Sequence, residues 1–132
     1  GREEPRMSLD TIRLSQQSKD QLVRLKRTTG IRNWNILCRW ALVMSLQDPS
    51  PPLVKEVASD SNVEMDWRTF AGTAHGDVYL ALLKQRCAAD GEDPTEEALS
   101  RTLHVHLQRG VGYLAGRKDL RSIQDLVGEA LA

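Results

Sequence analysis

The hydrophobic positions near the start of the chain repeat first with the period of a strand and then with that of a helix. Thr11 to Leu14 alternate polar and apolar residues, which predicts a short strand. Ser15 suits a helix N-cap and Gly30 suits the left-handed residue after a helix end, so we predict a helix between them. Its least polar positions fall on one narrow face, formed by Ser18, Leu22, Leu25 and Thr29.

A second helix is predicted over residues 33–46, and it is apolar around most of its circumference. Its polar stripe is thin and consists of Asn35, Arg39 and Ser45. A helix with this pattern has to be covered on more than one side. We therefore expect either the C-terminal half of the chain or another subunit to cover it, and we predict a homo-oligomer.

The rest of the chain predicts one weak strand and three further helices. Prolines in residues 48–52 end the second helix, and residues 63–68 alternate as a strand does. Asp77 is the predicted N-cap of the next helix, which Gly91 closes. Asp93, followed by a proline and then by Glu96, predicts the start of another helix. That helix is expected to reach about Arg109, before a glycine-rich bend at 110–112, and a last amphipathic helix is predicted over 120–131.

These elements predict a mainly α protein with about five helices and one or two short strands. Residues 9–132 are expected to form a single domain, and residues 1–8 a disordered or artificial extension. The order strand, helix, glycine, helix is that of a ribbon-helix-helix module, in which two chains pair their strands and lay the ribbon in the DNA major groove. In such a ribbon Thr11 and Arg13 face outward, whereas Ile12 and Leu14 face the core.

Composition fits a globular chain of this size. The 132 residues are 40% hydrophobic and 27% charged, close to the average of folded domains. No apolar run approaches the ~18 residues that a membrane helix needs. No charged-then-apolar leader precedes the fold, so we predict a cytoplasmic protein without a membrane span.

The net charge of zero conceals two oppositely charged halves. Residues 1–46 contain nine Lys or Arg and four Asp or Glu, a balance of +5, and residues 47–132 contain nine and fourteen, a balance of −5. Such a split is typical of a chain with one end facing a polyanion. Docking of the two halves, or of neighbouring subunits, is the alternative.

Catalytic and metal-binding patterns are weak. His104 and His106 are two residues apart and point away from each other on a helix. Cys38 and Cys87 belong to no metal or redox motif and are expected to be buried, reduced thiols. Gly110 to Ala115 fit a relaxed dinucleotide-binding pattern, but a helix rather than a strand precedes them. We predict no enzyme, no cofactor and no metal site.

The basic residues of the first helix point away from its apolar face. At about 100° per residue, Lys19, Arg24 and Arg27 spread over the opposite arc and Lys26 lies on its flank. Such side chains neutralise phosphates in nucleic-acid-binding proteins. A solvated helix face without a ligand is the alternative. The candidate DNA-binding residues are Arg13, Lys19, Arg24, Lys26, Arg27 and Arg32.

Four blocks of the sequence resemble the DndE family of DNA sulfur modification proteins. They are "RLSQQSKDQLVRLKRTTGIRNWNILCRWAL" (13–42), "SNVEMDWRTFAG" (61–72), "GDVYLALLKQRC" (76–87) and "HLQRGVGYL" (106–114). The resemblance implies a mainly helical, self-associating accessory protein of the bacterial machinery that replaces a phosphate oxygen of DNA with sulfur. It further implies binding of duplex DNA, preferentially nicked, and no catalytic residue. Lys19 and Lys26 fall within the matching lysine-bearing helix.

Three functions are compatible with the sequence. The first is a non-catalytic DNA-binding subunit that works with other components of the sulfur-modification complex. The second is a ribbon-helix-helix transcriptional regulator that reads bases through Thr11 and Arg13. The third is a protein-interaction adaptor, whose basic end meets an acidic partner instead of DNA.

Overall fold

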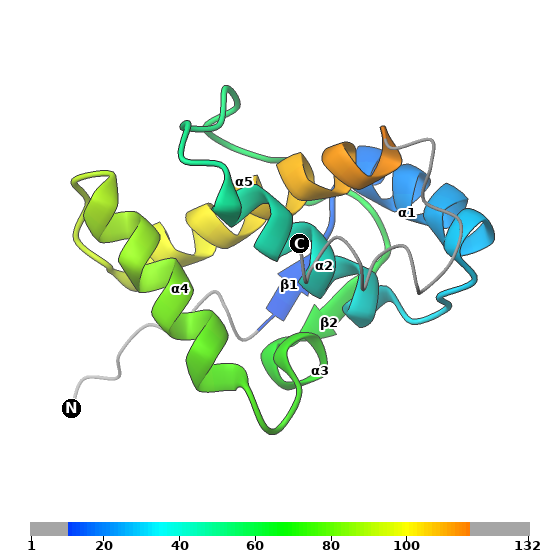
Figure 1. Cartoon of the computed structure of the whole chain (residues 1–132), viewed down its shortest axis with the longest axis horizontal. Coiled ribbons are helices and arrows are strands. Elements are labelled where there is room, and N and C mark those ends of the chain that lie inside the picture. Colours follow the sequence, from blue (N-terminus) through cyan, green and yellow to red (C-terminus); the bar gives the residue numbers. More distant parts are fainter. Residues whose placement is uncertain (1–10, 117–132) are drawn as a thin grey trace.

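The computed structural model describes residues 11–116 and is mainly α, as predicted. The expected helix at 120–131 and the extension at 1–8 lie outside the described residues. Figure 1 shows α5 running across the molecule, with α2 crossing it, α4 at one end and α1 at the other. In chain order the elements are β1 (Thr11–Arg13), α1 (Gln16–Thr29), α2 (Trp34–Gln47), β2 (Glu64–Asp66), α3 (Trp67–Ala71), α4 (Gly76–Ala89) and α5 (Glu96–Ala115).

The crossing of α2 and α5 is the centre of the fold. A Cβ atom placed on Gly110 would lie 1.8 Å from the carbonyl oxygen of Ala41, so the two backbones touch where only glycine fits. The predicted helix end at Arg109 and the glycine bend are therefore wrong. The helix continues through both glycines to Ala115 because packing against α2 outweighs the low helix propensity of glycine.

Local sequence signals predicted the start of α1 correctly but not the N-caps of α4 and α5. The Ser15 hydroxyl accepts a hydrogen bond from the backbone N–H of Ser18 (3.1 Å), and Gly30 ends α1 at φ 80°. In contrast, α4 begins at Gly76, which places Asp77 inside its first turn. The N-cap of α5 is Thr95 instead of Asp93, because the Thr95 hydroxyl accepts the N–H of Ala98 (3.1 Å).

The two strands pair within the chain. β1 and β2 are antiparallel, with Ile12 opposite Met65, and both side chains are buried. The alternating pattern at 63–68 predicted a longer strand than the one observed, since β2 ends at Asp66. The Asp66 carboxylate accepts the N–H of Thr69 (2.7 Å) and caps the short helix α3. Because β2 occupies one edge of β1, a ribbon between two chains would have to pair through the other edge of β1. The ribbon-helix-helix arrangement stays a prediction.

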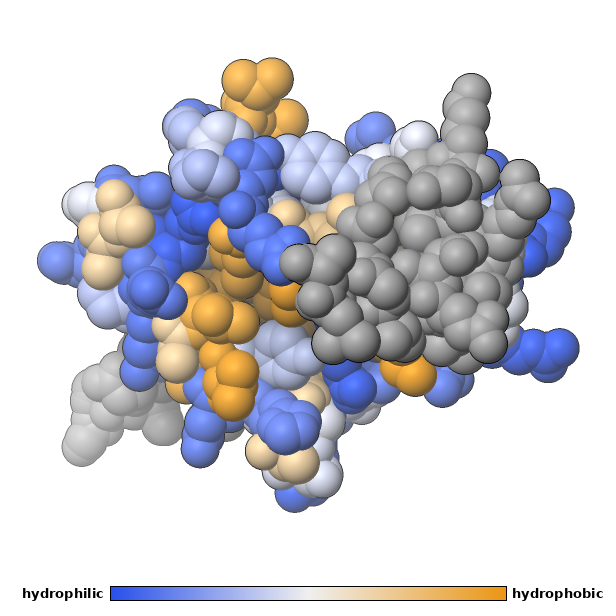
Figure 2. Space-filling view, viewed as in Figure 1, coloured by the Kyte–Doolittle hydropathy of each residue, from blue (hydrophilic) through white to orange (hydrophobic). Residues whose placement is uncertain are grey.

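The buried residues form one hydrophobic cluster, and α2 contributes to it without being fully covered. Leu37, Cys38, Ala41 and Leu42 are fully buried, whereas Trp40, Met44 and Leu46 on other sides of the helix are partly exposed. Figure 2 shows apolar atoms gathered in the hollow between α2 and α4. Burial raises the pKa of the Cys38 thiol to about 12. Within residues 11–116 no helix is long and apolar enough to cross a bilayer.

Candidate nucleic-acid interface

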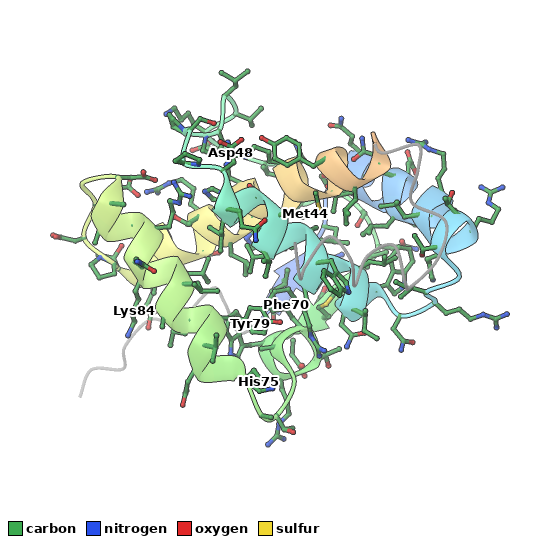
Figure 3. All side chains as sticks on the ribbon, viewed as in Figure 1. Met44, Asp48, Phe70, His75, Tyr79 and Lys84 are labelled. Carbon is green, nitrogen blue, oxygen red and sulfur yellow. The ribbon has the colours of Figure 1, made fainter. Side chains whose placement is uncertain are left out.

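The outer arc of α1 carries arginines that are directed into solvent. Leu22 and Leu25 bury the inner face of α1, which leaves Arg24 and Arg27 exposed on the opposite side. Arg32, in the turn before α2, is exposed as well. Among the residues that the structure describes, these three guanidinium groups have no hydrogen-bond or ion-pair partner. Figure 3 shows nitrogen-tipped side chains extending outward from α1 and the turn that follows it.

The two lysines of α1 lie on its flank and contact neighbouring side chains. The Nζ atom of Lys19 donates to Oδ1 of Asn62 (2.6 Å). The Nζ atom of Lys26 lies 3.9 Å from the centroid of the Trp34 ring, a cation–π contact with the first residue of α2. Both lysines remain partly exposed, so these contacts fix the positions of two cations beside the arginines.

Arg13 differs from the other candidate residues because its charge is paired. Its guanidinium donates to the carbonyl oxygen of Ser61 (3.0 Å) and forms an ion pair with Glu64, its neighbour across the sheet. The structure thus ties Arg13 to the β1–β2 sheet. Contact with DNA through Arg13 requires this ion pair to open, which makes it the weakest of the six candidates.

The segment that contains α1 carries a large excess of basic residues. Between residues 11 and 46 there are seven Lys or Arg and one Asp, a balance of 7 − 1 = +6. The single acid, Asp20, accepts a hydrogen bond from Nε2 of Gln16 (3.0 Å). The seventh cation, Arg39, donates to the carbonyl oxygens of Thr69 (3.3 Å) and Phe70 and so stabilises the end of α3.

Two further arginines are engaged at the end of α2. Arg109 donates through Nε to the Ser45 hydroxyl (2.8 Å) and through its two Nη atoms to the carbonyl oxygens of Ser45 (2.8 Å) and Ser50 (2.9 Å). Arg86 donates to the carbonyl oxygens of Leu46 (2.7 Å) and Asp48 (2.9 Å). These bonds add side-chain donors to carbonyls at the end of α2 and in the loop that follows it, where the helix no longer supplies its regular amide partners. The sequence carries no signal for them, because the partners are 38 to 64 residues apart.

The same arginine determines the state of a buried histidine. Because Arg109 donates to Oγ of Ser45, the Ser45 hydroxyl is free to donate to Nδ1 of His106, 2.7 Å away. Burial, with the positive charges of Arg109 and Arg86, lowers the pKa of His106 to about 4. His106 is therefore neutral at pH 7.

Asp48 completes this polar cluster at its outer side. The Tyr113 hydroxyl donates to Oδ2 of Asp48 (2.6 Å), and Ser50 donates its backbone N–H (2.9 Å) to Oδ1. These bonds hold the pKa of Asp48 well below its ordinary value and raise that of Tyr113. These groups satisfy one another's hydrogen-bonding capacity, so the cluster stabilises the end of α2 and the loop that follows.

Metal-ligating side chains are scattered over the described fold. Over residues 11–116, no three His, Cys, Asp or Glu side chains come together in a way that could hold a metal ion. The described fold thus defines a small helical protein with a two-stranded sheet and an array of cations on α1 and the turn after it.

The chain belongs to the DndE family: the family model described as DNA sulphur modification protein DndE matches residues 11–122. Its fold is similar to the crystal structure of DndE from Escherichia coli B7A, involved in DNA phosphorothioation modification. The TM-score is 0.63 at 28% identity, over 82% of this chain and 97% of the other. A DndE G21/24K mutant involved in DNA phosphorothioation has the same fold, with a TM-score of 0.60 at 21% identity over 79% and 96% of the two chains. No curated protein matches.

Proposed function

We propose that this chain is a non-catalytic DNA-binding subunit of the machinery that introduces phosphorothioate into DNA. The observation that carries the proposal is the group of exposed arginines at Arg24, Arg27 and Arg32, which have no partner among the described residues. Guanidinium groups donate in pairs to phosphate oxygens, and unpaired ones attract a polyanion from a distance. Membership in the DndE family supports DNA and the other components of the phosphorothioation system as the binding partners.

The five cations of α1 and its following turn have different parts in this contact. Arg24, Arg27 and Arg32 reach phosphates directly. Lys19 and Lys26 are held on the flank by Asn62 and Trp34 and add positive charge along the edge of the footprint. Contacts of this kind position a protein on duplex DNA without reading its sequence. We accordingly propose binding of duplex DNA, nicked or intact, with little sequence preference.

Fluorescence anisotropy with intact and nicked duplexes at several salt concentrations tests the proposal. The triple variant Arg24→Glu, Arg27→Glu and Arg32→Glu should bind far more weakly than the wild type. Its log–log salt dependence should be less steep by about 0.9 for each phosphate contact that is lost. Comparison of the two duplexes measures any preference for a nick.

Lys84→Glu is the matched control, because Lys84 is an exposed cation on α4, at the opposite end of the molecule from α1 (Figures 1 and 3). We expect this variant to keep the wild-type salt dependence. The control changes the net charge by one third as much as the triple variant, so a loss of binding free energy in that same proportion would show that only net charge matters. Wild-type affinity in the triple variant would rule out the α1 surface and favour the adaptor function.

We also propose that the protein self-associates through the partly exposed side of α2. Trp40, Met44 and Leu46 are apolar and only partly covered by the described residues. Burial of such side chains in an interface removes apolar surface from water and is favourable. Sedimentation at micromolar concentration should give an oligomer, and Met44→Asp should shift it toward monomer. A wild-type protein that sediments as a monomer contradicts this proposal.

A further inference from the structure

The loop after α2 places the most exposed large apolar side chain of the described residues at its tip. Leu53 is 97% exposed, and the next residue, Val54, is 48% exposed. Two prolines precede them at positions 51 and 52. In Figure 2 apolar atoms project from the edge of the molecule where Figure 1 shows this loop. Exposed leucines are common singly, so the surroundings of this one decide whether it has a role.

The base of the loop is fixed to the fold by many hydrogen bonds. Arg109 binds the carbonyl oxygens of Asp48 (3.2 Å) and Ser50 (2.9 Å), and Arg86 binds that of Pro49 (3.3 Å). The Asp48 carboxylate receives hydrogen bonds from Ser50 and Tyr113, as described above. Proline also fixes φ at three of the four positions from 49 to 52. The tip is therefore presented in a defined conformation, which lowers the entropy that binding has to overcome.

An apolar groove lies directly beside the tip. It has a volume of about 730 Å³ and runs between the loop and α5, lined by Pro51, Leu53, Val54, Val105 and Tyr113 among others. Tyr113 and Val54 are themselves partly exposed, so the tip and the groove form one continuous apolar surface. A continuous patch of this kind marks a binding site far better than an isolated leucine does.

The charges of the loop do not favour DNA as the ligand of its tip. Residues 47–63 contain Asp48, Glu56 and Asp60 but only one basic residue, Lys55. The balance within the loop is 1 − 3 = −2, in contrast with +6 over residues 11–46. The two arginines at its base, Arg86 and Arg109, are engaged with backbone carbonyls. The groove reaches α1 only at Gln17, in its first turn, whereas Arg24 and Arg27 lie in the second half of that helix. The tip therefore suits a protein surface, and it leaves α1 free.

We propose that residues 51–54 and the adjoining groove bind another, non-identical protein subunit through an apolar pocket with aromatic walls. Pro49 to Pro52 have the spacing Pro-x-x-Pro, which aromatic-lined grooves recognise, and Leu53 enters the pocket as the central anchor. The exposure of Leu53, the anchoring of the loop base and the charge of the loop support this surface independently of the proposed function. That the subunit belongs to the DNA-sulfur machinery rests on the proposed function.

Binding to the other purified subunits of the phosphorothioation machinery from the same organism, each immobilised in turn, tests the proposal. Leu53→Asp in the full chain should weaken binding to one of them at least about tenfold, as expected of a central anchor. Val78→Asp is the control, since Val78 is another exposed apolar residue (53%), located on α4. It should bind within about twofold of the wild type.

Two measurements on the isolated Leu53→Asp protein test whether Leu53 is covered by this same chain or by a second copy of it. Its Tm and sedimentation should match the wild type, because a side chain exposed to water contributes nothing to folding or self-association. A lower Tm or a changed oligomer would show that this chain or a second copy covers Leu53, and would overturn the proposal. Wild-type binding to every subunit, or equal loss in Val78→Asp, would overturn it too.

Measuring DNA binding by Leu53→Asp distinguishes a failure of the proposed subunit-binding tip from a failure of the proposed DNA-binding function. Anisotropy should give the wild-type affinity and salt dependence, because the tip contributes no phosphate contact. A large loss of DNA affinity would place DNA on the tip and contradict the assignment to a protein. If the wild-type protein binds no DNA, and Leu53→Asp still loses subunit binding, the proposal for the tip is supported and the DNA-binding proposal is refuted.

Discussion

The end of α2 and the outer face of α1 use the same side chain for opposite purposes. At the end of α2, the guanidinium of Arg109 meets a set of carbonyl oxygens and its side chain is only 12% exposed. On α1, Arg24 and Arg27 are exposed and have no partner among the described residues. One arginine holds a helix end and a loop in place, whereas the others are available to a ligand.

This difference shows why counting charges along the sequence is a poor guide to a binding surface. An arginine whose donors are all occupied by backbone carbonyls has little to offer a phosphate, and moving it costs the bonds that it makes. An exposed arginine on a rigid helix loses nothing of the fold when it binds. The comparison therefore predicts that stability and DNA affinity depend on separate sets of residues.

The strongest way to disrupt the α2 side is to separate its two helices. Gly110→Ala places a Cβ atom 1.8 Å from the carbonyl oxygen of Ala41, a backbone atom that cannot rotate away. Overpacking of a tight core typically costs about 1–3 kcal/mol, and we expect the free energy of unfolding to fall by more than about 3 kcal/mol. Urea denaturation followed by circular dichroism measures the loss.

Gly112→Ala is the matched control on the same helix. No atom lies within 4 Å of the Cβ position of Gly112, so alanine enters open space. Because alanine is the better helix former, this variant should gain about 0.5–1 kcal/mol. Equal destabilisation by the two substitutions would contradict the close approach to α2 as the specific reason for glycine at position 110.

Acid should weaken the α2 side through His106. Its pKa is about 6.5 when unfolded and about 4 when folded, so the folded state resists the proton. The resulting stability is complete above pH 6.5 and is lost as the pH falls toward 4. At about 1.36 kcal/mol per pKa unit, the total loss is on the order of 3 kcal/mol. Arg109 and Arg86 oppose protonation, and Asp90 and Asp48 favour it.

The variant His106→Asn isolates this contribution. Asparagine keeps an acceptor for the Ser45 hydroxyl but does not titrate, so the unfolding free energy should vary little between pH 6.5 and 4.5. Asp48 and Asp66, whose pKa values lie below the ordinary value, contribute to acid sensitivity only at lower pH. An equally steep loss in the variant over that window would assign it to other groups.

Local patterns in the sequence predicted the elements whose signals are local. The cap at Ser15, the glycine end of α1 and the mainly α class follow from residues within one turn of each other. The five residues of α3 are too few for a periodic pattern, although Asp66 three positions before Thr69 was a cap signal that sequence reasoning missed. Gly110 looked like a helix end because the reason for it, the backbone of α2, is remote in sequence.

The candidate interface was predictable in outline but not in detail. Helical spacing correctly placed Arg24 and Arg27 outward on α1. It gave no means of seeing that Lys19 and Lys26 contact Asn62 and Trp34, or that Arg13 pairs with Glu64. Those contacts join segments that only the fold brings together, and they decide how much of each charge is available.

Removal of the Arg109 guanidinium tests whether it supports the α2 end. Arg109→Met keeps much of the apolar stem but leaves the carbonyls of Ser45 and Ser50 without this donor. Charged hydrogen bonds contribute about 1.5–3 kcal/mol each in favourable cases, and we expect a net loss of about 2 kcal/mol. Arg101→Met on the same helix breaks only an exposed ion pair with Glu92 and should cost less than about 1 kcal/mol.

The smallest effect on stability is expected at Arg24, and it is the most direct test of the comparison. Arg24→Met removes a guanidinium that has no described partner and replaces it with another good helix former, so unfolding should change by less than about 0.5 kcal/mol. DNA affinity should nevertheless fall, with a salt dependence less steep by about 0.9. Arg109→Met should show the reverse, with lower stability and an unchanged salt dependence at a temperature where it is folded. If Arg24→Met destabilised the protein as much as Arg109→Met, the arginines of α1 would be supporting the fold, and the distinction between engaged and available arginines would fail.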